Sequence, residues 1–193
     1  MKFYERLSDE IEYGGKVYTI KPTYDRILKI FYVFNKEEGL LPGDYLGLCL
    51  DLLIEGKHPE SPGLLTAILE EITEPTENGQ HEPVLFDFEQ DSDLIYAGFM
   101  QAYGIDLTAE VGILRWEKFM ALFKGLPENT EFRRIVKLRA TPIPKANKQN
   151  MEYIAHLTKA KQAVALKSKT QKNFYQGLKN IVEQIKADAT KGR

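Results

Sequence analysis

Apolar positions along this chain first alternate as in strands and then recur with the spacing of helices. Residues 11–21 read IEYGGKVYTIK, two β-favouring runs around the pair Gly14-Gly15. Glycine takes positive φ angles without a steric penalty, which suits the two-residue turn of a hairpin. The segment therefore predicts an N-terminal β-hairpin, and Pro22 ends its strand character.

Three segments that predict helices follow the predicted hairpin. The first predicts a helix with Thr23 as its cap and Gly39 as its stop; the others predict helices over residues 43–54 and 64–72. The segment GDYLGLCLDLLI at 43–54 is apolar on nearly every side, which is typical of a helix enclosed by others. It therefore predicts the centre of the core. Residues 74–83 are rich in proline and glycine and predict a surface loop.

The next part of the chain contains residues typical of helix N-caps and C-terminal ends. The pattern predicts three helices, over residues 92–103, 109–124 and 128–139. The residues expected at their caps and stops are Asp91 or Ser92, Gly104, Thr108 and Gly125.

The C-terminal part differs in pattern from the rest. Residues 141–150 contain two prolines and predict a linker between a helical body at 1–140 and a lysine-rich amphipathic segment at 151–193. Residues 151–189 are almost free of helix breakers, which predicts one long helix. The predicted fold class is therefore mainly α: a helical body with a small N-terminal β-hairpin and a long C-terminal helix. The last helix carries one apolar stripe, formed by Phe174, Leu178, Ile181, Val182 and Ile185.

Composition and charge add two constraints. With 193 residues, 43% hydrophobic and 28% charged, the chain has the balance of a folded domain, alone or with an appendage. The charge is uneven: residues 142–193 hold eleven basic and three acidic side chains, whereas the residues before them hold 15 basic and 25 acidic ones. A basic tail beside an acidic body indicates contact with nucleic acid, with an acidic protein surface, or with the chain's own body.

The sequence favours neither export nor a membrane span. Its first ten residues, MKFYERLSDE, lack the basic and apolar regions of a secretory signal. The longest apolar run, at 45–54, is about half of the roughly 20 residues that a spanning helix needs. The single cysteine, Cys49, lies among leucines and is interpreted as a buried small apolar residue, as suits a reducing cytoplasm.

Residues that could carry catalysis or hold a metal are sparse. The three histidines form no close ligand pair, and the common hydrolase, nucleotide and redox motifs are missing, so we expect no enzyme active site, no metal site and no cofactor. The densest acidic group alternates like a calcium loop, but Ser92 stands where that loop needs glycine and Gly98 where it needs glutamate. A loop leading to a helix is the preferred interpretation, and a metal-dependent nuclease a distant one. The group consists of Asp87, Glu89, Asp91 and Asp93.

Two further surfaces are candidate binding sites. The segment ILRWEKFMALF places Trp116, Phe119, Met120 and Phe123 at i, i+3, i+4 and i+7, which favours a core stripe first and a partner-binding surface second. The lysines of the tail favour a solvated helix face. Nucleic-acid binding stays open as the alternative, although neither a zinc finger nor a base-stacking aromatic motif accompanies them.

Spaced motifs between residues 91 and 139 are similar to those of a known family. They read IYAGFMQAYGIDL, LRWEKFMALFKGLPENTEF and RRIVKLR. They resemble the phage gene-product-fifteen family of siphophages and prophages of Gram-positive bacteria, in which a YGIDL-like stop, a tryptophan helix, a GLP-like stop and a terminal arginine follow one another. Here the tryptophan is Trp116 and the arginine is Arg139. The chain departs from the family at Arg115 and Glu117, where members often carry histidine and a second tryptophan.

The resemblance implies a gene beside that of the long tape-measure protein, where siphophages encode tail assembly chaperones. Such a chaperone acts in the bacterial host cytoplasm and is not expected in the mature virion. It would cover the exposed apolar stripes of the tape-measure protein, and the tail-tube protein and a second copy of this chain are further candidate partners. The residues expected to contact a partner are Trp116, Phe119 and the stripe Phe174, Leu178, Ile181, Val182 and Ile185. The alternative for the stripe is that the last helix folds back and buries it against the chain's own body.

Overall fold

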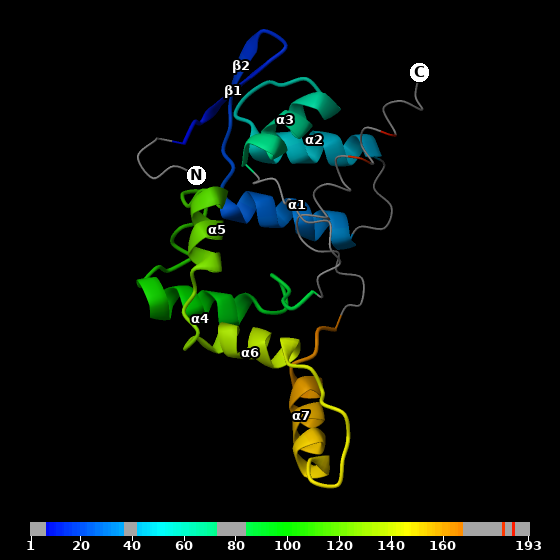
Figure 1. The fold of residues 1–193 in the computed structure, drawn as a ribbon. Coiled ribbons are helices and arrows are strands. Elements are labelled where there is room, and N and C mark those ends of the chain that lie inside the picture. Colours follow the sequence, from blue (N-terminus) through cyan, green and yellow to red (C-terminus); the bar gives the residue numbers. More distant parts are fainter. Residues whose placement is uncertain (1–6, 37–41, 73–83, 168–182, 184–186, 188–193) are drawn as a thin grey trace. The chain divides into compact units, whose positions relative to one another are not determined.

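The computed structural model describes residues 7–36, 42–72, 84–167, 183 and 187. The chain forms two compact units, and Figure 1 labels their helices and strands. The first holds the described residues up to 72 together with residues 108–121, and the second holds residues 84–107 and 122–167. The predicted division into a body, a linker at 141–150 and a C-terminal helix remains a prediction.

The N-terminal hairpin has the predicted form. Strands β1 (Glu10–Tyr13) and β2 (Lys16–Thr19) pair antiparallel, with Glu10 opposite Thr19 and Tyr13 opposite Lys16. Gly14 and Gly15 connect them with φ angles of 59° and 72°, the doubly positive backbone of a type I′ turn. The hairpin prediction is confirmed.

Three helices complete most of the first unit. Helix α1 (Tyr24–Lys36) packs on α2 (Pro42–Leu53), α2 packs on α3 (Pro62–Ile72), and α3 packs on β1. These helices occur where their apolar periodicity predicts them; the expected stop at Gly39 and the loop at 74–83 lie outside the described residues. The fully buried side chains of this core include Ile20, Ile27, Leu50, Leu53, Leu64 and Ile68.

Helix α2 is less enclosed than its sequence predicts. Leu46, Cys49, Leu50 and Leu53 are buried, but Asp44, Leu48 and Asp51 lie on an exposed face at i, i+4 and i+7. The prediction of a helix enclosed by others is therefore wrong for this face, while α1 and α3 pack against the helix elsewhere. Burial raises the pKa of the Cys49 thiol to about 12, which supports its interpretation as an apolar core residue.

Helix α5 (Trp116–Lys124) begins later than predicted, and Thr108 does not cap it. Residues 107–113 form turns, with Gly112 at φ 74°. The reason is tertiary pairing: the N–H of Tyr24 donates to the carbonyl of Leu114 at 2.9 Å, and the N–H of Trp116 donates to the carbonyl of Pro22 at 2.8 Å. These bonds, and the β-bridge between Thr23 and Arg115, tie residues 114–116 to the segment before α1, so the helix starts only at Trp116.

The second unit contains α4 (Ser92–Tyr103), α6 (Glu131–Ala140) and α7 (Met151–Ala163). Helix α6 packs on both α4 and α7. Gly104 ends α4 at φ 65°, as predicted, and Thr130 caps α6 by accepting the N–H of Arg133 at 3.4 Å. Four aromatic rings with centroids 5.1–6.0 Å apart pack beneath these helices: Phe86, Phe88, Phe123 and Phe132.

Helix α7 ends at Ala163, and residues 164–167 are not helical. The prediction of one uninterrupted helix over 151–189 is therefore wrong at this point. Hydrogen bonds from side chains outside the helix hold these residues instead. No helix in the described ranges is long and apolar enough to cross a membrane.

Candidate partner-binding site

A buried ion pair ties the start of α4 to the end of α6. Arg139 donates from Nη1 to Asp91 Oδ2 at 2.6 Å and from Nη2 to Asp91 Oδ1 at 2.8 Å. The two side chains are only 8% and 2% exposed. This two-bond geometry is the strong form of an arginine–carboxylate pair. It joins residues that lie 48 positions apart in the sequence.

Both partners of the ion pair make further hydrogen bonds, so little of their polar surface is left unpaired. Asp91 Oδ2 also accepts the backbone N–H of Asp87 at 3.0 Å, and Arg139 Nη1 also donates to the carbonyl of Leu85 at 3.0 Å. The carboxylate stands at the N-terminal end of α4, where the helix dipole favours negative charge. These additional hydrogen bonds offset the free-energy cost of removing the two charges from water.

Arg139 also reaches the chain beyond α7. Its Nε donates to the carbonyl of Val164 at 2.6 Å, immediately after the last residue of the helix. Gln90 holds the next residues with both ends of its amide: Nε2 donates to the carbonyl of Ala165 at 3.1 Å, and Oε1 accepts the N–H of Lys167 at 2.9 Å. These bonds occupy backbone groups that a continuing helix would use, which explains why α7 stops.

Lys161 fastens α7 to the end of α6. Its Nζ donates to the carbonyl of Arg139 at 2.7 Å and to the carbonyl of Thr141. Carbonyls in the last turn of a helix lack intrahelical partners and attract cations. We call Gln90, Asp91, Arg139 and Lys161 the C-terminal anchor, because together they hold residues 161–167 on the rest of the second unit.

Most of α7 is uncovered. Leu157 is its one buried residue, and Met151 and Tyr153 are 61% and 57% exposed. Ile154 and Lys161 are half-buried on the same side as Leu157, at i, i+3 and i+7. The helix therefore packs along a narrow line and leaves large apolar side chains of its first turn in solvent.

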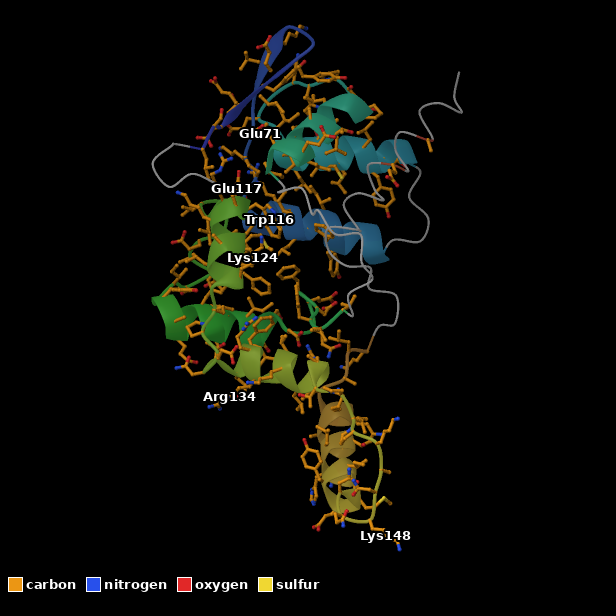
Figure 2. All side chains as sticks on the ribbon, in the orientation of Figure 1. Glu71, Trp116, Glu117, Lys124, Arg134 and Lys148 are labelled. Atoms are coloured by element: carbon orange, nitrogen blue, oxygen red, sulfur yellow. The ribbon has the colours of Figure 1, made fainter. Side chains whose placement is uncertain are left out.

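The residues expected to bind a partner fall into two groups. The stripe Phe174, Leu178, Ile181, Val182 and Ile185 lies outside the described residues. Trp116, labelled in Figure 2, and Phe119 are each 1% exposed. Their rings stack 5.5 Å apart, and Phe119 stacks on Tyr24 at 5.0 Å. The core interpretation of this aromatic segment is confirmed. A partner role for Trp116 and Phe119 remains a prediction, and it would require α5 to move first.

The two positions that depart from the family pattern interact with each other. Arg115 donates from Nη2 to Glu117 Oε1 at 2.8 Å, and its Nη1 pairs with Asp9 and donates to the carbonyl of Ser8 at 2.9 Å. Burial alone would lower the pKa of Arg115, but Glu117 and Asp9 hold it above its ordinary value. The pair ties α5 to the residue before β1 within the first unit.

The acidic group at residues 87–93 is used for structure. Asp91 is committed to Arg139, and Asp87 Oδ1 accepts the N–H of Gln90. Glu89 and Asp93 are exposed. Across the ranges that the structure describes, no three histidine, cysteine or acidic side chains come together as metal ligands would.

Sequence reasoning missed the C-terminal anchor as a unit. The sequence marks Asp91 as a candidate helix cap and as a member of the acidic group at 87–93, but it indicates no partner for it. Its side chain makes no capping bond, and nothing in the sequence singles out Gln90. No local pattern marks these residues, because their partners lie 48 to 77 positions away.

The fold defines a mainly helical protein with one small hairpin. At this site its polar residues form a network of ion pairs and hydrogen bonds with one another and with the backbone. The family model described as "Bacteriophage Gp15 protein" matches residues 3–166. The chain therefore belongs to the bacteriophage Gp15 protein family, as its motifs indicated. No curated protein and no solved structure matches it.

Proposed function

We propose that this protein is a non-catalytic tail assembly chaperone that binds the tape-measure protein through its C-terminal region. It would act in the cytoplasm of the infected bacterium and be absent from the mature virion. Membership of the Gp15 family supports a phage role, and the resemblance of its motifs to proteins encoded beside tape-measure genes supports the narrower one.

The C-terminal anchor is the observation that carries the proposal. Three side-chain hydrogen bonds fix residues 164–167 on the second unit. The chain that follows holds the apolar stripe at 174–185 among lysines. A binding segment that leaves from a fixed point loses less freedom on binding than one on a loose tether.

The physical need for such a partner follows from the length of a tape-measure protein. A long helical protein exposes its apolar stripes until tail-tube subunits surround it. An amphipathic segment that lays its apolar side on such a stripe covers it reversibly.

Co-purification tests this function directly. A tagged tape-measure protein from the neighbouring gene is co-expressed with the full chain, with the variant Leu178→Asp/Ile181→Asp, and with the control Gln176→Asp/Gln184→Asp. The control adds the same two charges at positions off the stripe. We expect the full chain and the control to co-purify with the tape-measure protein. The stripe variant should not, because burying carboxylates in the contact costs roughly several kcal/mol. Equal capture of all three would refute the proposed contact.

The nucleic-acid alternative gives a different result in the same preparation. A chain that uses its basic tail on DNA or RNA would be retained on nucleic acid at about 50 mM salt and released as salt rises. Removal of residues 145–193 would abolish that retention. Retention of this kind, without capture of tape-measure protein, would assign the tail to nucleic acid instead.

A further inference from the structure

The free end of α7 combines exposed apolar and basic side chains. We call Lys145, Lys148, Met151 and Tyr153 the basic tip; all four are exposed. The turn that carries the lysines is ordered by its own hydrogen bonds: Asn150 Nδ2 donates to the carbonyl of Lys145 at 2.9 Å, and Asn147 N–H donates to Asn150 Oδ1 at 2.7 Å. The tip is therefore a defined surface.

The basic tip lies far from Lys161, which bonds α7 to the end of α6. Ten residues separate Met151 from Lys161, which at a rise of about 1.5 Å per residue is about 15 Å along the helix axis. Figure 2 shows Lys148 beyond one end of α7, the end farther from α6. Within the second unit, the described structure leaves this end uncovered.

The first unit carries a surface of opposite charge. Residues 42–72 hold six carboxylates and a single lysine, Lys57. The exposed face of α2 places Leu48, 37% exposed, between Asp44 and Asp51. Glu60 lies beside the same helix, since its Oε1 would be 3.5 Å from a Cβ at Gly47. We call Asp44, Leu48, Asp51 and Glu60 the acidic stripe.

The carboxylates of the acidic stripe are available for a cation from outside. The side chain of Asp51 is 74% exposed, and its Oδ1 lies 3.0 Å from His58 Nε2, within hydrogen-bonding distance. Asp44 and Glu60 form no ion pair with another described residue. Each surface thus has exposed apolar side chains, methionine and tyrosine on one and leucine on the other. Lysines precede those of the tip, which also carries the exposed Glu152, 3.8 Å from His156 Nε2, and carboxylates flank the leucine of the stripe.

We propose that the protein self-associates head to tail, with the basic tip of one copy docked on the acidic stripe of a second copy. Met151 then packs on Leu48, and the lysines face Asp44 and Glu60. The two surfaces differ, so each copy keeps one tip and one stripe for further copies, and the assembly grows or closes into a ring. The contact is small, of the size class below about 1,200 Å² that gives weak association.

Sedimentation velocity of the full chain, alone and across a range of concentrations, tests this inference without any tape-measure protein. We expect the average mass to rise with concentration in about 0.1 M salt. In about 1 M salt, where the Debye length falls from about 10 Å to about 3 Å, the association weakens. A monomer at all concentrations, including one whose tip docks within its own chain, would overturn the proposal.

Charge reversal then identifies the surfaces. The tip variant Lys145→Glu/Lys148→Glu and the stripe variant Asp44→Lys/Glu60→Lys should each lose self-association, with an apparent Kd raised about tenfold or more. A mixture of the two variants should associate again, because each acidic tip then meets a basic stripe and each basic tip an acidic stripe. The control Lys16→Glu/Lys118→Glu changes the same charge at exposed positions outside both surfaces and should associate like the unchanged protein.

The outcomes separate this proposal from its alternatives. Melting temperatures within a few degrees of the unchanged protein establish that the variants are folded. Association that persists in the tip variant, or a mixture that stays monomeric, rejects the contact. If the tip variant loses only retention on DNA while the unchanged protein is a monomer, the tip binds nucleic acid and the self-association proposal is wrong.

Discussion

The hydroxyl of Tyr13 on β1 lies against the backbone of Gly63 at the start of α3. A Cβ at residue 63 would collide with this hydroxyl and would lie 3.1 Å from Cζ of the same ring. The hydroxyl is also hydrogen-bonded to Ser61 Oγ at 3.0 Å. The hairpin and α3 therefore approach one another closely because residue 63 has no side chain.

We predict that Gly63→Ala lowers the free energy of unfolding by about 1–3 kcal/mol, the usual cost of overpacking. The ring cannot retreat without losing its bond to Ser61. Chemical denaturation measures the loss. In a Tyr13→Phe background the same substitution should cost less, since the colliding hydroxyl is gone. An equal cost in both backgrounds would contradict this account.

Gly47 provides the matched control for Gly63. It also lies within a helix, but a Cβ there meets only Glu60 Oε1 at 3.5 Å, an ordinary contact. Gly47→Ala should therefore be neutral, or stabilising by up to about 1 kcal/mol from helix propensity.

Removing either partner of the Asp91–Arg139 pair should destabilise the protein strongly. Asp91→Asn or Arg139→Ala leaves a buried group uncompensated, which costs about 3–5 kcal/mol. Thermal unfolding should shift down by roughly 6–20 °C for a chain of this size. Arg134→Ala serves as the control, because Arg134 and Glu131 form an exposed pair at 3.6 Å that contributes about 1 kcal/mol or less. Small shifts for both buried variants would show that the pair is not structural.

The turn at Gly112 should give a pH-dependent contribution to stability. Burial alone would raise the pKa of Asp25. The N–H of Gly112 donates to Asp25 Oδ1 at 3.0 Å, and Lys29 is nearby. Together they lower the pKa of Asp25 below its ordinary value of 3.8. A depressed carboxyl pKa stabilises the folded state above the unfolded pKa, and this contribution is lost as pH falls through the folded value.

Stability curves of the unchanged protein and of Asp25→Asn should therefore differ most at neutral pH and converge below about pH 4. Urea denaturation at several pH values measures this difference. The control Asp93→Asn alters an exposed aspartate in the second unit and should leave the pH profile unchanged. A constant difference between the protein and Asp25→Asn at every pH would exclude a titrating Asp25 as its cause.

Gln90→Ala should loosen the chain after α7 without unfolding it. The amide of Lys167 loses its acceptor and the carbonyl of Ala165 loses its donor. Hydrogen exchange of a peptide covering residues 164–167 should become faster, while peptides from α4 and α6 keep their protection. Unchanged exchange at Lys167 would show that Gln90 does not hold this segment.

The sequence predicts most elements because their signals are local. Gly14 and Gly15 specify a turn, Gly104 specifies a helix end, and apolar periodicity locates α1, α3 and α4. The motif-based expectation of the family is also confirmed. These features depend on a few neighbouring residues, so a single sequence is sufficient to read them.

The missed features all depend on partners distant in the sequence. Residues 108–113 have helical character, yet pairing of Leu114 and Trp116 with residues near Pro22 prevents a helix there. Residues 164–167 contain no breaker, yet Arg139 and Gln90 hold their backbone. In both places a tertiary hydrogen bond overrides local preference, and no pattern within ten residues reports it.

The burial of Cys49 makes the protein suitable for site-selective fluorescent labelling. A thiol whose pKa is about 12 is in the reactive thiolate form in only about one molecule in 10⁵ at pH 7. It is also 4% exposed, so a maleimide dye cannot reach it in the folded protein. A cysteine introduced at an exposed position such as Lys16 or Lys148 would therefore accept a dye alone, with the native Cys49 left in place. Energy transfer between such dyes could report the separation of the two units in solution.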